Sequence, residues 1–559
     1  MEAKHFKFWP DGVPRTIEIP DRSIHANLEA SAAQHPGKPA IVFYGASLSY
    51  SELKGQVDLV AGFLQQRCAV RKGDRVLLNM QNCPQFIIAY YAILRAGAMV
   101  VPVNPMNLTG ELRHFVADSD ARTMLTAQEL YPLAAPLLQE GVLDHIIVAS
   151  YAEYAGEPAS EELPEAAAAA PEEIIGPGVV LWRDALAAQL PPEQLVIHGS
   201  DKCVMPYTSG TTGQPKGCVH THSTVMSSIL AGALWISTED DARVLATLPL
   251  FHVTGMQSSM NGPLYRGSTI VLMTRWDRDI AARLIQRHRI SAWTNIATMA
   301  IDFLANPELH RYDISSLENI GGGGAAMPQS VAQRLKELTG LTYVEGYGLS
   351  ETMAPTHINP PSRAKQQCLG IPICSTDSRV IDPDTLAQRP PGEVGEIVSS
   401  GPQLFLGYWK NPEATAAAFI ELDAKRFFRT GDLGYCDPDG YFFLVDRLKR
   451  MINASGFKVW PAEVESMLYA HPDIHEVCVI GSRDARRGET VKAVVVLRDT
   501  ANTRTDGASI VKWAREHMAA YKVPRVIEFA RSLPKSATGK IRWRLLQDQE
   551  NQRTDRVRT

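Results

Sequence analysis

The sequence predicts an α/β protein with a large N-terminal domain of doubly wound α/β layers and a β-rich subdomain, followed by a small α+β C-terminal domain. Between residues 40 and 103, short apolar runs of strand length alternate with segments of helical periodicity, which is the pattern of parallel strands covered by helices. The same alternation returns at residues 266–305. The chain has 559 residues, which is too many for one hydrophobic core.

The elements of the first hundred residues follow from the spacing of apolar side chains. We expect an amphipathic helix over residues 24–37, and Ser51 is the expected N-cap of a second helix over residues 52–66. The other expected elements are strands at 40–43 and 48–50 around a turn at 44–47, a strand at 75–80, a helix over 84–95 and a buried strand at 99–103.

The alternation continues along the chain after one break in composition. Residues 153–177 are acidic and rich in alanine, which predicts an exposed, partly helical insertion without chemistry. The later expected elements are helices over 222–236, 277–289 and 509–518, strands at 243–248, 269–273, 292–295, 317–320, 393–399, 477–481, 491–497 and 526–529, and a hairpin turn at 437–440.

Composition and charge show no membrane or nucleic-acid signature. Hydrophobic residues make up 45% of the chain, charged residues 21%, and the net charge is −5, which gives no support to nucleic-acid binding. The apolar run from Phe86 to Leu94 ends at Arg95 and is too short to cross a bilayer. The eight cysteines form no C-x-x-C pair, which indicates reduced thiols rather than a zinc site. We therefore expect a cytoplasmic protein without a transmembrane segment.

The stretch from Tyr207 to His222 concentrates small hydroxyl residues and glycines around Lys216. Glycines let backbone N–H groups approach an anion, hydroxyls add donors and lysine adds a positive charge, so the stretch predicts a polyphosphate-binding loop rather than a flexible linker. Its flanks indicate a strand before it and a helix after it. It is not a Walker A loop, because Lys216 follows Pro215 and precedes Gly217, whereas that motif requires Gly-Lys-Ser or Gly-Lys-Thr.

The run YTSGTTGQPKG in this stretch resembles the signature loop of the adenylate-forming superfamily, which contains acyl-CoA synthetases, adenylation domains of peptide synthetases and luciferases. GGGGAAM at 321–327, EGYGLSET at 345–352 and PKSATGK at 534–540 resemble further motifs of that superfamily in the same order. Two positions depart from the usual pattern, Ala326 in place of proline and Ser350 where threonine is commoner. The glycine run also fits a sharp strand–helix junction.

The resemblance implies a nucleotide site. Tyr347 would stack on adenine, Asp432 would bind the ribose hydroxyls, Ser350 would donate to the α-phosphate and Glu351 would hold Mg²⁺. By itself, Asp432 also fits a tight turn. The residues implied to bind ATP or AMP are Thr208, Ser209, Gly210, Thr211, Thr212, Gly213, Lys216, Gly324, Ala325, Ala326, Glu345, Gly346, Tyr347, Gly348, Asp432 and Arg447.

The resemblance also implies a mobile C-terminal domain that carries Lys540 as the catalytic lysine. It divides the chain into an N-terminal AMP-binding domain (residues 1–446, with the β-rich subdomain at about 360–446), a hinge (447–449) and the C-terminal domain (450–559). Lys449 would be the pivot of the hinge. Ser455 and Gly456 would lie beside the bound CoA.

The activity implied is that of an ATP-dependent acyl-CoA synthetase that uses ATP, Mg²⁺ and CoA and activates a medium- or long-chain fatty acid. The expected acyl pocket is His252, Asn295, Thr298 and Gly323, although His252 also fits a packed core residue. An aryl-acid CoA ligase and an acyl-AMP ligase that loads a carrier protein stay open as alternatives. A luciferase-like oxygenase and a nucleotide-binding regulatory module are less favoured. A homodimer is one possible assembly.

Overall fold

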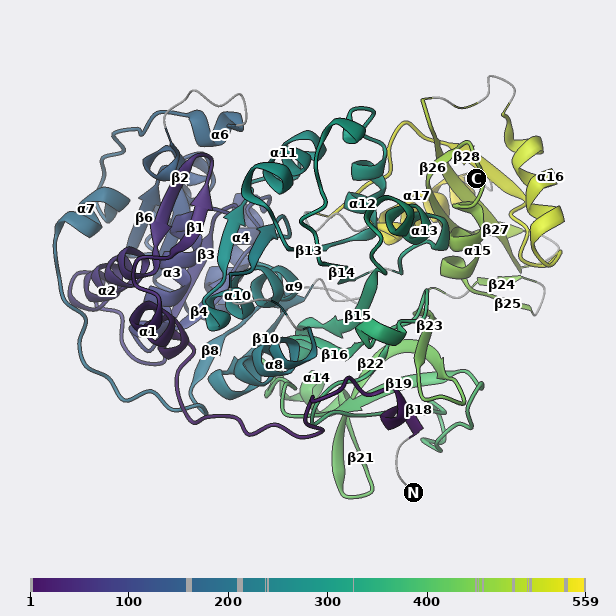
Figure 1. The fold of residues 1–559 in the computed structure, drawn as a ribbon, viewed down its shortest axis with the longest axis horizontal. Helices are drawn as coiled ribbons and strands as arrows, with labels where there is room; N and C mark the ends of the chain where they lie inside the picture. The colour runs from purple at the N-terminus through teal and green to yellow at the C-terminus, as the bar shows by residue number, and fades with distance from the viewer. Residues whose placement is uncertain are drawn as a thin grey trace.

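The computed structural model describes residues 4–156, 163–208, 215–236, 238, 241–324, 326–447, 450, 452–454, 457–484, 488–499, 501, 505–536 and 541–556. Within these residues the strands form four sheets, and helices cover the two largest. Figure 1 shows those two sheets with their helices in the purple and teal part of the chain, the strands of the third sheet below them in green, and the C-terminal sheet at one side in yellow.

The first sheet contains the strands that carry the glycine run and most of the EGYGLSET segment. Its order is β17 (Ile371–Pro372), β16 (Ala354–Ile358), β15 (Val344–Leu349), β14 (Asn319–Gly323), β13 (Ala292–Asn295), β11 (Arg243–Ala246), β12 (Thr269–Leu272), β1 (Pro39–Phe43) and β2 (Ala46–Ser49). The strands from β1 to β15 in this order run parallel. Their carboxyl ends therefore meet at one edge, where ligands of open α/β sheets bind.

Helices connect the parallel strands of the first sheet. They are α11 (Arg278–His288), α12 (Ala297–Leu304) and α13 (Gln329–Thr339). The segment before β12 folds as α9 (Val253–Gly255), a π-helical turn (Met256–Asn261) and α10 (Gly262–Arg266). A π-helical turn inside a helical segment is rare and is found mostly near functional sites.

The second sheet carries the signature loop. Its order is β20 (Gly407–Tyr408), β10 (Lys216–Thr221), β8 (Lys202–Val204), β4 (Met99–Pro102), β3 (Arg75–Asn79), β5 (Thr123–Ala127), β6 (His145–Ala149) and β7 (Val179–Leu181), with β9 (Tyr207–Thr208) also paired to β10. The helices of this part of the chain are α1 (His25–Gln34), α2 (Tyr50–Gln66), α3 (Pro84–Arg95), α4 (Thr109–Ser119), α5 (Tyr131–Gln139), α6 (Glu165–Ala168), α7 (Trp182–Ala187) and α8 (His222–Trp235). Every residue of α3 is buried, so this helix forms the centre of the largest core.

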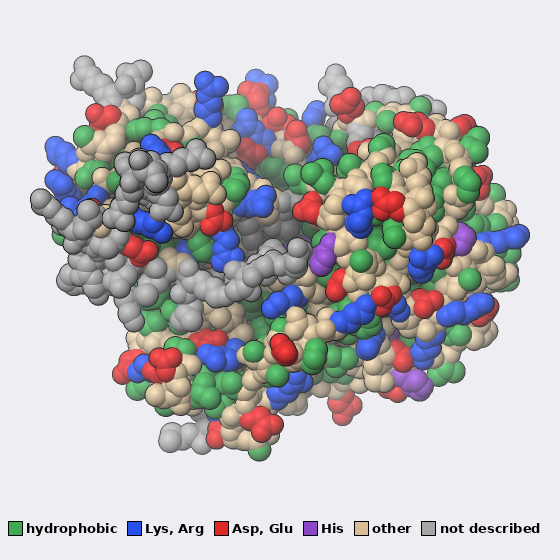
Figure 2. Space-filling view, turned by 180° about the vertical axis from the view of Figure 1, so that it is seen from behind, with side chains coloured by type: hydrophobic (Ala, Val, Ile, Leu, Met, Phe, Trp, Pro, Cys, Tyr) green, Lys and Arg blue, Asp and Glu red, His purple; other side chains and the backbone are tan. Residues whose placement is uncertain are grey.

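The third sheet is antiparallel and the fourth is mixed. The third contains β18 (Asp377–Ile381), β19 (Gly395–Ser400), β21 (Phe419–Leu422), β22 (Lys425–Cys436) and β23 (Phe442–Arg447), and α14 (Pro412–Ala417) precedes β21. The fourth contains β24 (Ile452–Ala454), β25 (Phe457–Val459), β26 (Ile474–Asp484), β27 (Gly488–Leu497) and β28 (Val526–Phe529), with α15 (Pro461–Leu468), α16 (Gly507–His517) and α17 (Trp543–Arg556). Its buried residues form a core of their own. Seen from behind, the surface is hollowed between this C-terminal part and the rest of the molecule (Figure 2).

The predicted α/β architecture is confirmed, and several elements have the predicted bounds. The helix at 84–95 and the strands at 292–295 and 526–529 agree at both ends. The acidic stretch forms only a short helix, Glu165–Ala168, among its described residues. The sequence did not predict α4, α5 and α17, nor the strands β5 and β6.

Three local predictions are wrong. The N-cap of α2 is Ser49 rather than Ser51, because Ser49 and Glu52 form a reciprocal capping box. The signature loop is followed by strand β10 rather than directly by a helix. The glycine run does not follow the strand at 317–320, since Gly321–Gly323 are part of β14 itself.

Asp432 does not lie in a tight turn. It is a buried residue of the long strand β22, where it is paired in register with Arg447 of β23. The turn at 437–440 does connect β22 to β23, as predicted, and its last residue Gly440 has a positive φ of 92°.

We predict that Ser49→Ala raises the hydrogen-exchange rate of the first-turn amides of α2 about fivefold, since loss of an N-cap costs about 1 kcal/mol. Ser49 Oγ accepts from the Glu52 N–H at 3.3 Å, and Glu52 Oε2 accepts from the Ser49 N–H at 2.8 Å. Mass-spectrometric exchange on the peptide that begins α2 measures this change. Ser51→Ala is the matched control and should leave the rate unchanged. Equal rates in both variants would contradict the assignment of the cap.

Candidate active site

The signature loop closes a β-hairpin. Thr208 of β9 is paired with Lys216 of β10, and Tyr207 with Gly217, so the chain leaves and re-enters the sheet at adjacent positions. A Cβ atom on Gly217 would lie 2.7 Å from Met205 Sδ, which explains the glycine at this position. The predicted phosphate-binding residues Ser209, Gly210, Thr211, Thr212 and Gly213 lie outside the described residues.

Strand β10 also holds the segment Ser350–Thr352, which forms a 3₁₀ turn after β15. His220 Nε2 lies 2.8 Å from the backbone oxygen of Ser350 and Nδ1 lies 3.1 Å from Thr224 Oγ1. Burial lowers the pKa of His220 to about 4, so the imidazole is neutral at neutral pH and donates Nε2–H to the Ser350 carbonyl. Ser350, which we predict to contact the α-phosphate, is thus hydrogen-bonded to β10, the strand that begins with Lys216.

Glu351, the predicted metal ligand, is a buried carboxylate in the same turn. The Tyr408 hydroxyl donates to Glu351 Oε1 at 2.9 Å, and the Phe405 N–H donates to the Glu351 backbone oxygen at 2.8 Å. Lys216 Nζ lies 5.0 Å from the centre of the Tyr408 ring. Glu351 therefore contacts the hydroxyl of Tyr408, and Lys216 contacts its ring.

Tyr347 and Asp432 meet, although 85 residues separate them in the chain. The Tyr347 hydroxyl donates to Asp432 Oδ2 at 2.6 Å, and both residues are buried. His357 packs against the Tyr347 ring with the ring centres 5.7 Å apart. The residues predicted to bind adenine and ribose are therefore adjacent, and Arg447 is the register partner of Asp432.

Glu345 is a buried carboxylate at the start of the EGYGLSET segment. Its Oε2 accepts from the Met327 N–H at 3.1 Å, which connects β15 to the end of the GGGGAAM segment. Burial raises the pKa of Glu345 to about 7. Gly324 and Ala326 are exposed beside this contact, and Ala325 lies outside the described residues.

Close backbone packing explains why glycines occupy these positions of β14 and β15. A Cβ on Gly322 would lie 1.8 Å from the Asn295 backbone oxygen, one on Gly323 would lie 2.3 Å from the Gly346 oxygen, and one on Gly348 would lie 1.9 Å from the Ala354 oxygen. Close approach of neighbouring backbone therefore requires these glycines without any ligand.

The predicted acyl-pocket residues come from four elements, β13, β14, α12 and the start of α9. Asn295 ends β13, is fully buried and accepts a hydrogen bond from the Tyr343 hydroxyl at 3.2 Å. Asn295 is the register partner of Gly322, next to Gly323. Thr298 is half-buried in α12. His252 is half-buried, and its Nδ1 accepts from the Thr254 N–H at 3.4 Å as the N-cap of α9.

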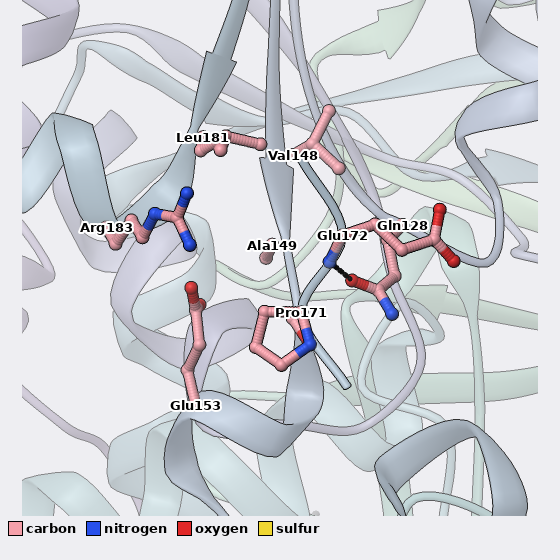
Figure 3. A pocket seen from close by; sticks show the side chains of 9 residues that line it. Gln128, Val148, Ala149, Glu153, Pro171, Glu172, Leu181 and Arg183 are labelled. Atoms are coloured by element: carbon pink, nitrogen blue, oxygen red, sulfur yellow. Dashed lines mark hydrogen bonds between the residues drawn. The ribbon is translucent and has the colours of Figure 1, made fainter. Parts of the chain in front are cut away.

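A small cavity lies away from these residues, beyond the ends of β6 and β7. Figure 3 shows Glu153 and Arg183 facing one another across it, with Gln128 and Pro171 on its other side. Burial raises the pKa of the Glu153 carboxyl. None of the predicted site residues that the structure describes lines this cavity.

The C-terminal predictions fall largely outside the described part of the chain. Lys449, Ser455, Gly456 and Lys540 are not described, and of Arg447 only the backbone is. On either side of Ser455 and Gly456, residues 452–454 and 457–459 form the paired antiparallel strands β24 and β25. The Gln367 side-chain amide donates to Ser466 Oγ of α15, so the C-terminal part contacts the rest of the chain.

Sequence reasoning missed the roles of His220 and Tyr408. His220 stands in the stretch VHTH, where a buried neutral histidine has no distinctive spacing. Tyr408 stands in GYWKNP, 192 residues after Lys216 and 57 after Glu351 in the chain. Contacts at such separations leave no local pattern in the sequence.

Comparison with known proteins identifies both parts of the chain. The model of the AMP-binding enzyme family matches residues 28–409, and that of the AMP-binding enzyme C-terminal domain matches residues 463–540. A long-chain-fatty-acid–CoA ligase of Bacillus subtilis is 36% identical over 97% of both chains. A feruloyl-CoA synthase of Amycolatopsis is 33% identical over 91% of this chain and 95% of its own.

Solved structures agree with these sequence matches. The anthranilate CoA ligase AuaEII in complex with anthranoyl-AMP has a TM-score of 0.85 at 26% identity, covering 97% of this chain and 99% of its own. ATP-bound MatB from Rhodopseudomonas palustris has a TM-score of 0.82 at 26% identity, covering 95% and 99%. In the described part of this chain, no helix has the length and apolar character needed to cross a membrane.

We predict that Glu345 makes stability depend on pH. The folded protein holds the Glu345 proton up to a pH of about 7, whereas an ordinary glutamate releases it near 4.5. The contribution of Glu345 to the free energy of unfolding therefore falls as the pH rises between these values. Glu345→Gln should remove this fall. The free energy of unfolding is measured in urea at about pH 5 and about pH 8. Its decrease between these two values should be smaller in the variant than in wild type by up to about 3 kcal/mol.

Glu337→Gln, at an exposed position of α13, is the matched control and should retain the wild-type pH dependence. An unchanged pH dependence in Glu345→Gln would show that Glu345 is ionised in the folded protein throughout this range.

Proposed function

The chain belongs to the AMP-binding enzyme family, and on this basis we propose that it is an ATP-dependent acid–thiol ligase for medium- or long-chain fatty acids. The enzyme activates the acid as acyl-AMP with release of pyrophosphate and then transfers the acyl group to CoA with release of AMP. The observation that carries this proposal is similarity to relatives named long-chain-fatty-acid–CoA ligases, which extends over 97–98% of both chains.

The first step must bring an anionic carboxylate onto an anionic α-phosphate, so neutralising charge is its main requirement. Lys216 and the donors from Thr208 to Thr212 hold the β- and γ-phosphates in this proposal. Ser350 donates to the α-phosphate. No general base is required, because the attacking carboxylate is already ionised at neutral pH.

Glu351 fits the role of a Mg²⁺ ligand. Its carboxylate is a hard oxygen donor held by Tyr408, and the described residues contain no group of three or more His, Cys, Asp or Glu side chains arranged around a metal. Magnesium is commonly held by one or two carboxylates together with substrate phosphates, and this arrangement matches that pattern. When bound, Mg²⁺ neutralises phosphate charge.

The nucleoside binds between two sheets in this proposal. Tyr347 stacks on adenine beside the Gly324–Ala326 backbone, with Glu345 bracing that segment through Met327. Asp432 accepts hydrogen bonds from the ribose hydroxyls, and in the structure the Tyr347 hydroxyl donates to it. Arg447, the register partner of Asp432, contacts ribose or phosphate.

The second step uses the C-terminal domain. Residues 1–446 and 450–559 form the two domains, and the hinge at 447–449 changes the backbone dihedrals of Lys449 between the steps. Lys540 serves the adenylation step and then withdraws, so that Ser455 and Gly456 approach the thiol arm of CoA. The matching of separate family models to residues 28–409 and 463–540 supports two domains. A cytoplasmic location and a homodimer stay predictions.

The proposed acyl pocket favours an acid with an apolar tail. His252, Asn295, Thr298 and Gly323 include no lysine or arginine that would pair with a second carboxylate. The aryl alternative has specific support, because the feruloyl-CoA synthase and the anthranilate CoA ligase are also similar to this chain.

A pyrophosphate-release screen over acids of increasing chain length and over aryl acids distinguishes the two. We predict that turnover efficiency rises along the aliphatic series and that acids of long chain exceed benzoate and ferulate by about tenfold or more, since each buried methylene contributes about 0.8 kcal/mol. Higher turnover efficiency with an aryl acid than with every aliphatic acid would contradict the fatty-acid proposal and favour an aryl-acid CoA ligase.

We predict that Lys540→Ala slows acyl-adenylate formation by about 10²–10³-fold, because it removes the cation that balances charge between the carboxylate and the α-phosphate. ATP affinity should stay near that of wild type in an equilibrium binding assay. Lys512→Ala, at an exposed position of α16, is the matched control with wild-type rates. Wild-type adenylation by Lys540→Ala would contradict the role of Lys540.

A further inference from the structure

The segment Gly407–Lys410 contacts both charged residues of the proposed phosphate site, Lys216 and Glu351, through Tyr408. Strand β20 (Gly407–Tyr408) pairs with β10 on the side away from β8, with Cys218 opposite Tyr408. The Trp409 N–H donates to the Gly217 oxygen at 2.8 Å, directly beyond Lys216. This segment therefore determines where the base of the signature loop lies relative to its neighbours.

Tyr408 contacts both charged residues with different parts of its side chain. Its hydroxyl donates to Glu351 Oε1 at 2.9 Å. The face of its ring lies 5.0 Å from Lys216 Nζ, within the range of a cation–π contact. A phenol keeps its proton at neutral pH and a carboxylate only accepts, so the Tyr408 hydroxyl is the donor in this contact.

The backbone around Tyr408 is held from several sides. The Tyr408 N–H donates to Thr415 Oγ1 at 2.9 Å, and a Cβ on Gly407 would lie 2.5 Å from Thr415 Cγ2. The Tyr408 ring packs edge-on against Phe405 with ring centres 4.9 Å apart. A side chain held this firmly presents its hydroxyl at a defined position.

The neighbouring tryptophan anchors the same segment to α4. Trp409 Nε1 donates to the Asp118 backbone oxygen at 2.9 Å, and the Tyr207 hydroxyl donates to Asp118 Oδ2 at 2.6 Å. Asp118 thus supports both the first strand of the signature hairpin, through Tyr207, and the β20 segment, through Trp409.

We propose that Tyr408 is a positioning residue of the adenylation step, which fixes the Glu351 carboxylate for its metal and holds Lys216 beside it. This inference rests on the proposed function, in which Glu351 is the Mg²⁺ ligand and Lys216 binds phosphate. Residues that hydrogen-bond a metal ligand orient it, and losing one such bond costs about 10–100-fold in metal affinity or activity.

The test is the Mg²⁺ dependence of ATP binding, measured by calorimetric titration of the full-length protein over a series of Mg²⁺ concentrations. Tyr408→Phe keeps the ring beneath Lys216 and removes only the hydroxyl. We expect the Tyr408→Phe variant to need about 10–100-fold more Mg²⁺ than wild type for half-maximal enhancement of ATP affinity. Its ATP affinity in excess EDTA and its KM for the acid should stay at wild-type values.

Tyr91→Phe is the matched control for loss of a buried hydroxyl. The Tyr91 hydroxyl on α3 donates to Asn261 Oδ1 of the π-helical turn at 2.9 Å, and Tyr91 is fully buried. Its removal should lower the thermal midpoint without changing the Mg²⁺ dependence. If Tyr408→Phe acts only through stability, the two variants will behave alike, and the proposal is overturned.

A double-mutant cycle with Glu351→Gln separates positioning from a general effect. Because Tyr408 acts through Glu351, the Tyr408→Phe change should have no further effect on Mg²⁺ dependence once Glu351 is replaced. Additive effects would overturn the proposal, as would wild-type Mg²⁺ dependence in Tyr408→Phe. Failure of the proposed function itself would be seen separately, as wild-type protein that forms no acyl-CoA from ATP, acid and CoA.

Discussion

The position of strand β10 is the constraint on which the candidate active site depends. It pairs with β9, β8 and β20, and through His220 it also holds the turn that contains Ser350 and Glu351. A polyphosphate site requires donors and cations at fixed places, because positioning them during the reaction would cost free energy. The hydrogen bonds of this one strand provide that fixed frame at the base of the signature loop.

The charged groups of the site are arranged around two tyrosines. Tyr408 contacts both Lys216 and Glu351, and Tyr347 donates to Asp432. Each tyrosine offers an apolar ring and a single donor, so it can pack in a partly buried position and still orient a carboxylate. The proposed functions of the two carboxylates differ, one toward the metal and one toward ribose, but both depend on the orientation that a phenol imposes.

Much of the fold could be predicted from local patterns. The buried helix α3 was found because its apolar run specifies it without reference to distant contacts, and β13 was found as the second strand of a β–α–β alternation at residues 266–305. The N-cap at Ser49 could have been predicted, because Ser49 and Glu52 have the S-x-x-E spacing of a capping box, whereas the residue three positions after Ser51 is Lys54. The extent of β14 was missed because glycines lower strand propensity, whereas here they allow Asn295 and Gly346 to approach.

The candidate site could be predicted only as a set of motifs. Resemblance to the adenylate-forming superfamily indicated Tyr347, Glu351 and Asp432, but the sequence could not show that Tyr347 meets Asp432 across 85 residues. It gave no reason to single out His220 or Tyr408, since a side chain that orients another carries no motif of its own. Such contacts depend on strand pairing between β10 and β20, which is a long-range property of the fold.

The most direct test of the account is a single-turnover experiment that separates the two half-reactions. Enzyme mixed with ATP, Mg²⁺ and a long-chain fatty acid without CoA should accumulate enzyme-bound acyl-AMP and release pyrophosphate, both detected by mass spectrometry. Addition of CoA should convert the acyl-AMP to acyl-CoA and AMP. Formation of acyl-CoA with ADP and phosphate as products, or acyl-AMP that persists after CoA is added, would contradict the account.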